Sequence, residues 1–101
     1  MKIAICVDGS EEKAKVSDVF GRCKYFAVYD SESEKLEFIK NPGDGASRGA
    51  GISAGQVLID RKIEKVYCSN IGPNAERILS QGGIENEVVK EKSVKEIINE
   101  L

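Results

Sequence analysis

The sequence AGISAGQVLIDRKIEKVYCS (residues 50–69) decides the fold, because the spacing of its apolar residues changes part-way along it. Ala54, Val57 and Leu58 follow the three- and four-residue repeat of a helix, which predicts a helix over about residues 50–62. The apolar run after it is short and rich in residues that favour β-strands. A helix that leads directly into a buried strand indicates a crossover between parallel strands, which is typical of an α/β fold.

Strands come before this stretch, and strand–helix units come after it. The expected strands cover residues 2–7, 24–30, 36–40, 65–69 and 84–89, and the expected helices begin at residues 50, 73 and 94. A polar connection between the second and third strands predicts a hairpin. Right-handed crossovers then predict a mixed five-stranded sheet of order 3-2-1-4-5, in which strand 2 is antiparallel, with three helices.

Two sequence features predict how the helices pack. Gly51 and Gly55 lie four residues apart on one helix face, which predicts close packing of the first helix on the sheet, with close approach to a ligand as the alternative. Ser93 and Glu96 have the spacing of a capping box. The third helix, which follows them, is expected to bury Val94, Ile97, Ile98 and Leu101.

Length and charge limit the functions open to this chain. Its 101 residues suffice for one domain over residues 1–101, with a core that needs no disulfide. The formal net charge of −2, from 15 basic and 17 acidic residues, disfavours binding to nucleic acid or to an anionic membrane. No apolar run is long enough for a membrane span or a signal peptide, so we expect a cytoplasmic protein. Charged residues on the third strand, an edge of the sheet, favour a monomer or weak dimer.

The chain contains no histidine and three cysteines. The lack of histidine excludes Ser-His-Asp triads, Cys-His dyads and histidine-ligated zinc. An odd number of cysteines without C-x-x-C spacing predicts free thiols. Arg22 beside Cys23 favours a thiolate that could ligate a soft metal, and Cys6 and Cys68 are expected nearby, at the ends of adjacent strands. The alternative is that these thiols are small hydrophobic groups of the core.

Three loops are expected at one edge of the sheet, because strands 1, 3 and 4 point the same way. They are residues 8–23, 41–50 and 70–73. Strands 1 and 4 meet at a topological switch point, where open α/β sheets form ligand crevices. The glycine-rich second loop opens a helix, so its N–H groups and Arg48 are candidates for contacts to an anion, with a plain surface loop as the alternative. The Gly72 turn either shapes a similar site or only caps the second helix.

Short motifs occur in these loops in a definite order. They are Asp8, Val16-Ser17-Asp18-Val19-Phe20-Gly21-Arg22, Asn41-Pro42-Gly43, Gly49-Ala50-Gly51 and Asn70-Ile71-Gly72-Pro73-Asn74-Ala75. In this combination the chain resembles the dinitrogenase iron-molybdenum cofactor biosynthesis family over nearly its whole length. The resemblance implies a ribonuclease H-like fold. It also implies a protein that is not an enzyme and that binds or carries an iron-molybdenum-sulfur type cluster or its precursor.

The resemblance further implies a binding surface. It comprises Ser17, Phe20, Gly21, Arg22, Asn41, Gly43, Gly49, Gly51, Asn70, Gly72 and Asn74. Many relatives have histidine just before Phe-Gly-Arg and near the glycine-rich loop, whereas this chain has Val19 and no histidine. Three explanations stay open: Cys23 acts as the soft ligand, the ligand is held by anion contacts alone, or the protein has another role.

The leading hypothesis is therefore a non-catalytic carrier of a metal–sulfur cluster or of an oxyanionic metal species such as molybdate or thiomolybdate. Cofactor-assembly or acceptor proteins are its expected partners. A two-metal nuclease is disfavoured, because Asp8 ends strand 1 but Asn70 stands after strand 4, and helix 1 offers only Asp60 near its far end. A module that acts through protein contacts, without a metal, is the third hypothesis.

Overall fold

A computed structural model describes residues 1–17, 20–45 and 49–101. Its elements are β1 (Lys2–Val7), β2 (Tyr25–Asp30), β3 (Lys35–Lys40), α1 (Ala50–Asp60), β4 (Lys65–Cys68), α2 (Pro73–Gln81), β5 (Glu85–Val88) and α3 (Val94–Asn99). In these residues the strands form one five-stranded sheet of order β3-β2-β1-β4-β5. β2 is antiparallel to both of its neighbours, and β1, β4 and β5 pair in parallel. The predicted strand order and the ribonuclease H-like α/β arrangement are confirmed.

β1 is the central strand of the sheet. Ile5 lies opposite Ala27 of β2 on one side and opposite Tyr67 of β4 on the other. Residues 3–7 are all buried. A strand that is covered on both faces needs a continuous apolar run rather than alternating polarity, and the sequence IAICV supplies one. The edge strands β3 and β5 are exposed or half-buried, so they tolerate their charged residues.

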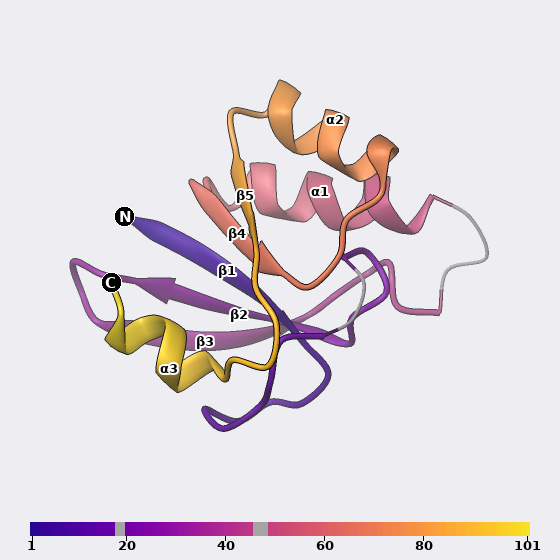
Figure 1. Cartoon of the computed structure of the whole chain (residues 1–101). Coiled ribbons are helices and arrows are strands. Elements are labelled where there is room, and N and C mark those ends of the chain that lie inside the picture. The colour runs from indigo at the N-terminus through magenta and orange to yellow at the C-terminus, as the bar shows by residue number, and fades with distance from the viewer. Residues whose placement is uncertain (18–19, 46–48) are drawn as a thin grey trace.

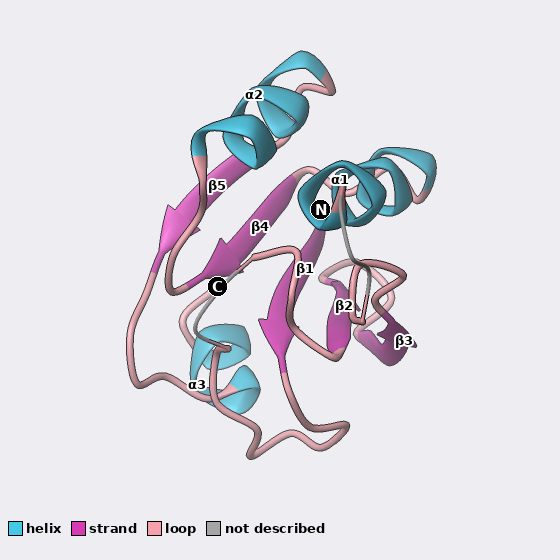
Figure 2. Ribbon diagram, turned by 90° about the vertical axis from the view of Figure 1, so that its right-hand side faces the viewer, coloured by secondary structure: helices cyan, strands magenta, loops and turns pink. Residues whose placement is uncertain are grey.

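Helices cover both faces of the sheet, with α1 and α2 on one face and α3 on the other (Figure 1, Figure 2). The buried side chains form two clusters, one beneath each helical layer. The first includes Cys6, Phe26, Leu58, Val66 and Leu79, and the second includes Ile5, Val7, Tyr67, Val94 and Ile97. Both chain ends lie at the left of Figure 1, the chain between β3 and α1 lies at the right, and the first part of the loop after β1 lies at the bottom. Within the described residues, no helix has the length and apolar character needed to cross a bilayer.

α1 packs on the sheet through Ala54 and Leu58, but its two glycines face α2, so the predicted partner of the glycine face is wrong. A Cβ atom on Gly51 would lie 3.1 Å from the Cβ of Ala75, and one on Gly55 would lie 2.6 Å from the Cγ2 of Ile78. Both neighbours belong to α2. The two glycines therefore let two helices of the same layer approach each other, which sequence spacing alone does not distinguish from contact with a sheet.

α3 begins as predicted but ends earlier. The Ser93 hydroxyl accepts a hydrogen bond from the Glu96 N–H at 3.2 Å, and the Glu96 carboxylate accepts one from the Ser93 N–H at 3.4 Å, which confirms the capping box. Two of the four predicted core residues of this helix are buried, and Ile98 is half-buried. The prediction that Leu101 is buried is wrong, because the helix stops before it and its side chain is 54% exposed.

Candidate functional site

The loops after β1, β3 and β4 are bound to one another at the carboxyl end of the sheet. The N–H of Phe20, in the loop after β1, donates to the carbonyl of Asn70, after β4, at 2.9 Å. The N–H of Asn41, after β3, donates to the carbonyl of Lys24 at 3.0 Å, just before β2. Segments that are far apart in the sequence thus meet where the sequence predicts a ligand site. We call the surface formed by the described residues of the loops 8–23, 41–50 and 70–73, together with the start of α2, the loop edge.

Asn41 fixes the loops after β1 and β3 against each other. Its side chain is 3% exposed, and its Nδ2 donates to the carbonyls of Gly21 at 3.1 Å and Cys23 at 2.7 Å. Its Oδ1 accepts from the Gly43 N–H at 2.8 Å. A buried amide that is satisfied by three backbone groups specifies one arrangement of the chain, since each group would be costly to leave unpaired. Asn41, predicted as a binding residue, therefore acts as a backbone clamp.

Three glycines of the predicted binding surface contact backbone. A Cβ atom on Gly43 would overlap the carbonyl oxygen of Gly21 and lie 2.6 Å from that of Ala50. Gly21 has a φ of +93°, and a Cβ atom there would lie 3.1 Å from the Cα of Gly51. Gly21, Gly43 and Gly51 are thus required for the close approach of the motif segments to one another.

Ser17 and Phe20 are also buried beneath the loop edge. The Ser17 hydroxyl donates to one carboxylate oxygen of Asp8 at 2.9 Å, and the Lys24 N–H donates to the other at 3.2 Å. Phe20 is 3% exposed, and its ring centroid lies 5.8 Å from that of Phe26. Asp8, the acid that a nuclease would need, therefore closes the first loop through both of its oxygens.

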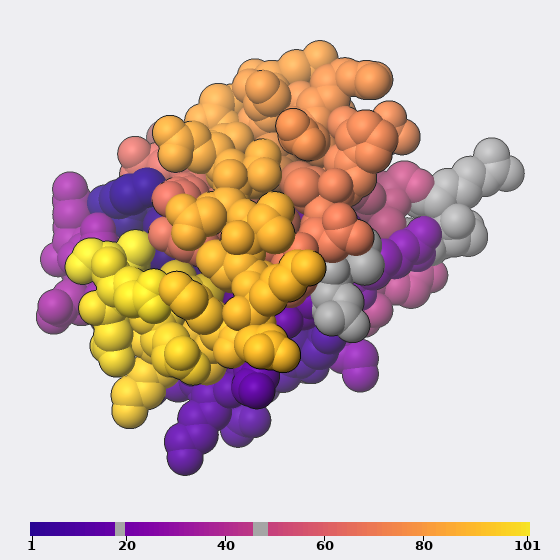
Figure 3. Space-filling view, viewed as in Figure 1, coloured from indigo at the N-terminus to yellow at the C-terminus, as the bar shows by residue number. Residues whose placement is uncertain are grey.

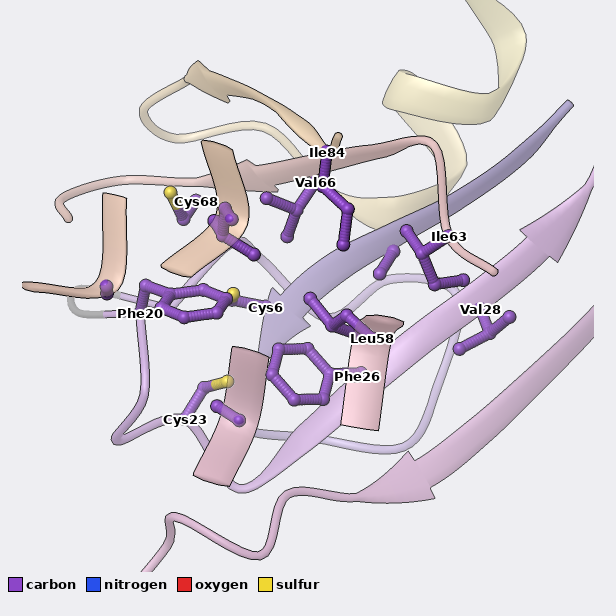
Figure 4. Packing of buried hydrophobic residues seen from close by; sticks show 14 residues of the cluster. Cys6, Phe20, Cys23, Phe26, Val28, Leu58, Ile63, Val66, Cys68 and Ile84 are labelled. Carbon is purple, nitrogen blue, oxygen red and sulfur yellow. The ribbon is translucent and has the colours of Figure 1, made fainter. Parts of the chain in front are cut away.

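The three cysteines lie in one buried cluster close to Phe20 (Figure 4). All three are free thiols without exposed surface. Burial raises the pKa of the Cys6 thiol well above its ordinary value, and a hydrogen bond with Cys23 adds to this effect. Burial also raises the pKa of Cys68 to about 11. Both thiols are therefore protonated near neutral pH, which opposes metal ligation.

Cys23, the predicted soft ligand, has no surface that a ligand at the loop edge can touch. Its sulfur lies 3.6 Å from Nδ2 of Asn41, which donates to it. Within residues 1–17, 20–45 and 49–101, no three Cys, Asp or Glu side chains are placed to hold a metal ion. The ligand role of Cys23 stays a prediction, and the burial of its sulfur counts against it.

Only some of the predicted binding residues are exposed to solvent. Its members are Arg22, Gly49, Asn70, Gly72 and Asn74, whereas Arg48 lies outside the described residues. Gly49, with a φ of 66°, precedes α1 and Gly72 precedes α2, and neither helix start has a side-chain cap. The first N–H groups of a helix have no partner within it, so they are available to solvent or to an anion.

A hollow that no sequence motif indicates lies beside Asn70. It has a volume of about 540 Å³ and is lined by Ser69, Asn70, Ile71, Val88 and Lys90. Lys90 belongs to none of the motifs, so a search for motifs does not find it. Its place just beyond β5, at the same carboxyl end of the sheet as the loop edge, is the signal that points to it.

The sequence profile described as dinitrogenase iron-molybdenum cofactor matches residues 1–101, the whole chain. The protein belongs to the dinitrogenase iron-molybdenum cofactor family. This membership confirms the resemblance seen in the loop motifs. It also relates the chain to a family of small cofactor-related proteins.

Solved structures resemble this family member closely. The apo form of the orange protein from Desulfovibrio gigas is 28% identical, with a TM-score of 0.91 over 97% of this chain and 83% of that chain. An NMR structure of a Thermotoga protein of the DUF35 family, with a provisional NifB description, is 32% identical, with a TM-score of 0.84 over 97% of this chain and 84% of that chain. An uncharacterized protein from Methanocaldococcus jannaschii is 28% identical over 101 residues, which are 97% of this chain and 82% of that protein.

Proposed function

We propose that this protein binds and carries an anionic metal–sulfur cargo of the iron-molybdenum cofactor type, or its oxyanionic precursor, and that it is not an enzyme. The match to the dinitrogenase iron-molybdenum cofactor family over the whole chain carries this proposal. The cargo is bound transiently: cofactor-assembly proteins deliver it, and acceptor proteins receive it.

The exposed part of the loop edge is the proposed contact surface. Arg22, Asn70 and Asn74 offer side-chain donors there, and the uncapped starts of α1 and α2 offer backbone N–H groups. Such donors, together with the positive ends of the helix dipoles, favour a negatively charged species. The chain thus has a means to hold an anionic cargo without histidine.

The buried motif residues and half-buried Gly51 support this surface from below. Asn41 and the glycine contacts hold the loops after β1 and β3 in one arrangement, and the Phe20–Asn70 hydrogen bond joins them to the loop after β4. A surface that is already ordered loses less conformational entropy when it binds. Ser17, Phe20, Gly21, Asn41, Gly43 and Gly51 are accordingly proposed as positioning residues.

Donor contacts, rather than bonds to thiolates, are the proposed means of attachment. The Cys6 and Cys68 thiols are protonated near neutral pH, because burial raises the pKa of each. Cys23 lies beneath the surface, in contact with Asn41. A cargo on the loop edge therefore contacts Arg22 and backbone N–H groups before it could contact any sulfur of the protein.

Metal retention after anaerobic loading tests this proposal. The protein is incubated with iron, sulfide and molybdate, desalted, and analysed for metal content and visible absorption. We expect a coloured complex at a fixed ratio of metal to protein, retained by Cys23→Ser and reduced severalfold in Arg22→Gln. Arg61→Gln is the matched control, because Arg61 pairs with Glu37 at 3.2 Å near the opposite end of α1.

Two results would contradict the proposal. A wild-type protein that retains no metal under any loading condition would refute the carrier function. Loss of the complex in Cys23→Ser, with Arg22→Gln unaffected, would show thiolate ligation in place of donor contacts. Thermal unfolding of each variant checks that the comparison is made between folded proteins.

A further inference from the structure

The hollow beside Asn70 lies where β4 and β5 end together. The N–H of Val89 donates to the carbonyl of Cys68 at 2.9 Å, so the two strands stay paired at the base of the hollow. Figure 3 shows this face, with the lighter-orange end of β5 beside the darker-orange loop after β4. The volume of about 540 Å³ lies within the range of known ligand pockets. We call it the β4–β5 hollow.

The charge of its lining distinguishes the β4–β5 hollow from four other hollows formed by the described residues. Among residues 1–17, 20–45 and 49–101, Lys90 is the one charged residue that lines the hollow, and none of its lining residues there carries a carboxylate. In the described parts of the chain, the Lys90 side chain makes no hydrogen bond or ion pair. Four further hollows in those parts are each lined by at least one carboxylate: Glu87 and Glu100, Glu76 and Glu85, Asp30 and Glu37, and Glu34.

The neutral part of the lining combines donors with an apolar wall. Ser69 and Asn70 supply a hydroxyl and an amide, and the Asn70 side chain has no hydrogen-bond partner within residues 1–17, 20–45 and 49–101. Ile71 and Val88 supply apolar surface, and Val88 is 52% exposed. A single cation with an apolar wall suits a large, weakly hydrated anion, because little hydration is lost when such an anion is covered.

We propose that the β4–β5 hollow is an anion subsite in which Lys90 is the counter-charge. The inference rests on the proposed function, since it assigns a second contact to the same cargo. Asn70 belongs both to the loop edge and to the hollow, so one ligand can touch both surfaces. The loop edge contacts one side of an anionic, sulfide-rich cargo, and the hollow contacts another side of it.

Anaerobic titration of the full chain with tetrathiomolybdate, followed by visible absorption and equilibrium dialysis, tests the subsite. Lys90→Gln should weaken binding about tenfold, since one charge-assisted contact is removed. Val88→Glu, which places a carboxylate in the hollow at an exposed position, should weaken it by at least as much. Lys35→Gln removes the same charge at the start of β3 and should stay within about twofold of the wild type.

The outcomes separate this inference from the proposed function. If the affinity of Lys90→Gln for tetrathiomolybdate stays within about twofold of the wild-type affinity, the subsite is overturned. The proposed carrier function is then unaffected. Equal weakening by Lys90→Gln and Lys35→Gln also overturns the subsite, because the effect is then one of net charge. A wild-type protein that binds neither tetrathiomolybdate nor the iron, sulfide and molybdate mixture refutes both.

Discussion

Replacement of Gly43 by alanine should destabilise the protein strongly, although it adds only one methyl group. The new Cβ atom would overlap the carbonyl oxygen of Gly21 and lie 2.6 Å from that of Ala50. Both obstacles are backbone atoms, so no side chain can rotate away. Relief requires the loop after β3 to move by several tenths of an ångström, against the hydrogen bond between the Gly43 N–H and Asn41.

The magnitude follows from the rigidity of these contacts. Overpacking in a well-packed region costs typically about 1–3 kcal/mol, and backbone obstacles place Gly43→Ala at the upper end. The loss of chain freedom in the unfolded state offsets about 0.5 kcal/mol of this. A net loss of about 2.5 kcal/mol corresponds to a fall in Tm of roughly 10–20 °C for a domain of this size.

Thermal unfolding followed by far-ultraviolet circular dichroism measures this effect. Gly72→Ala is the matched control, because Gly72 has a φ of −79° and a Cβ atom there meets nothing within 4 Å. The control should unfold within about 1 kcal/mol of the wild type, since only its modest preference as a helix cap is lost. If Gly43→Ala and Gly72→Ala unfold at the same temperature, the close backbone packing is refuted.

Three further predictions concern stability. Asn41→Leu should lower the free energy of unfolding by about 3 kcal/mol in urea titrations, because it strands three buried backbone groups, whereas the exposed Asn99→Leu should lower it by less than about 1 kcal/mol. Ser93→Ala should cost about 1 kcal/mol by the same assay through loss of the capping box, and an unchanged midpoint would contradict this. Folding raises the pKa of Cys68 to about 11, so the unfolded chain loses this proton first. The free energy of unfolding should therefore fall by about 2 kcal/mol between about pH 9 and 11, and Cys68→Ala should show a shallower fall; an equally steep decline in both proteins would disprove the role of this thiol.

The sequence predicts the sheet well because its signals are periodic and local. The continuous apolar run of β1 can be accommodated only at a central position, and the change of period after Ala50 identifies the crossover to β4. Crossover handedness then leaves few possible topologies. These rules do not depend on which side chains meet in space.

The candidate site is harder to predict because one residue type serves two purposes. A glycine in a motif is consistent with two roles. It can let a ligand reach the backbone, or it can let two segments of the chain pack closely against each other. Gly43 belongs to the second kind, and only the positions of Gly21 and Ala50 show it. Lys90 carries no local pattern at all, and it becomes notable only once the ends of β4 and β5 lie together.

The hydrogen bonds of Asn41 make the order of the loop edge depend on the pairing of β3. Asn41 follows β3, the outer strand, yet it holds the carbonyls of Gly21 and Cys23 in the loop after the central strand. A chain whose outer hairpin has come away loses the alignment of its first loop, even while β1 and β4 remain paired. Formation of the loop edge therefore depends on the edge strand β3, although none of the exposed motif residues belongs to that strand.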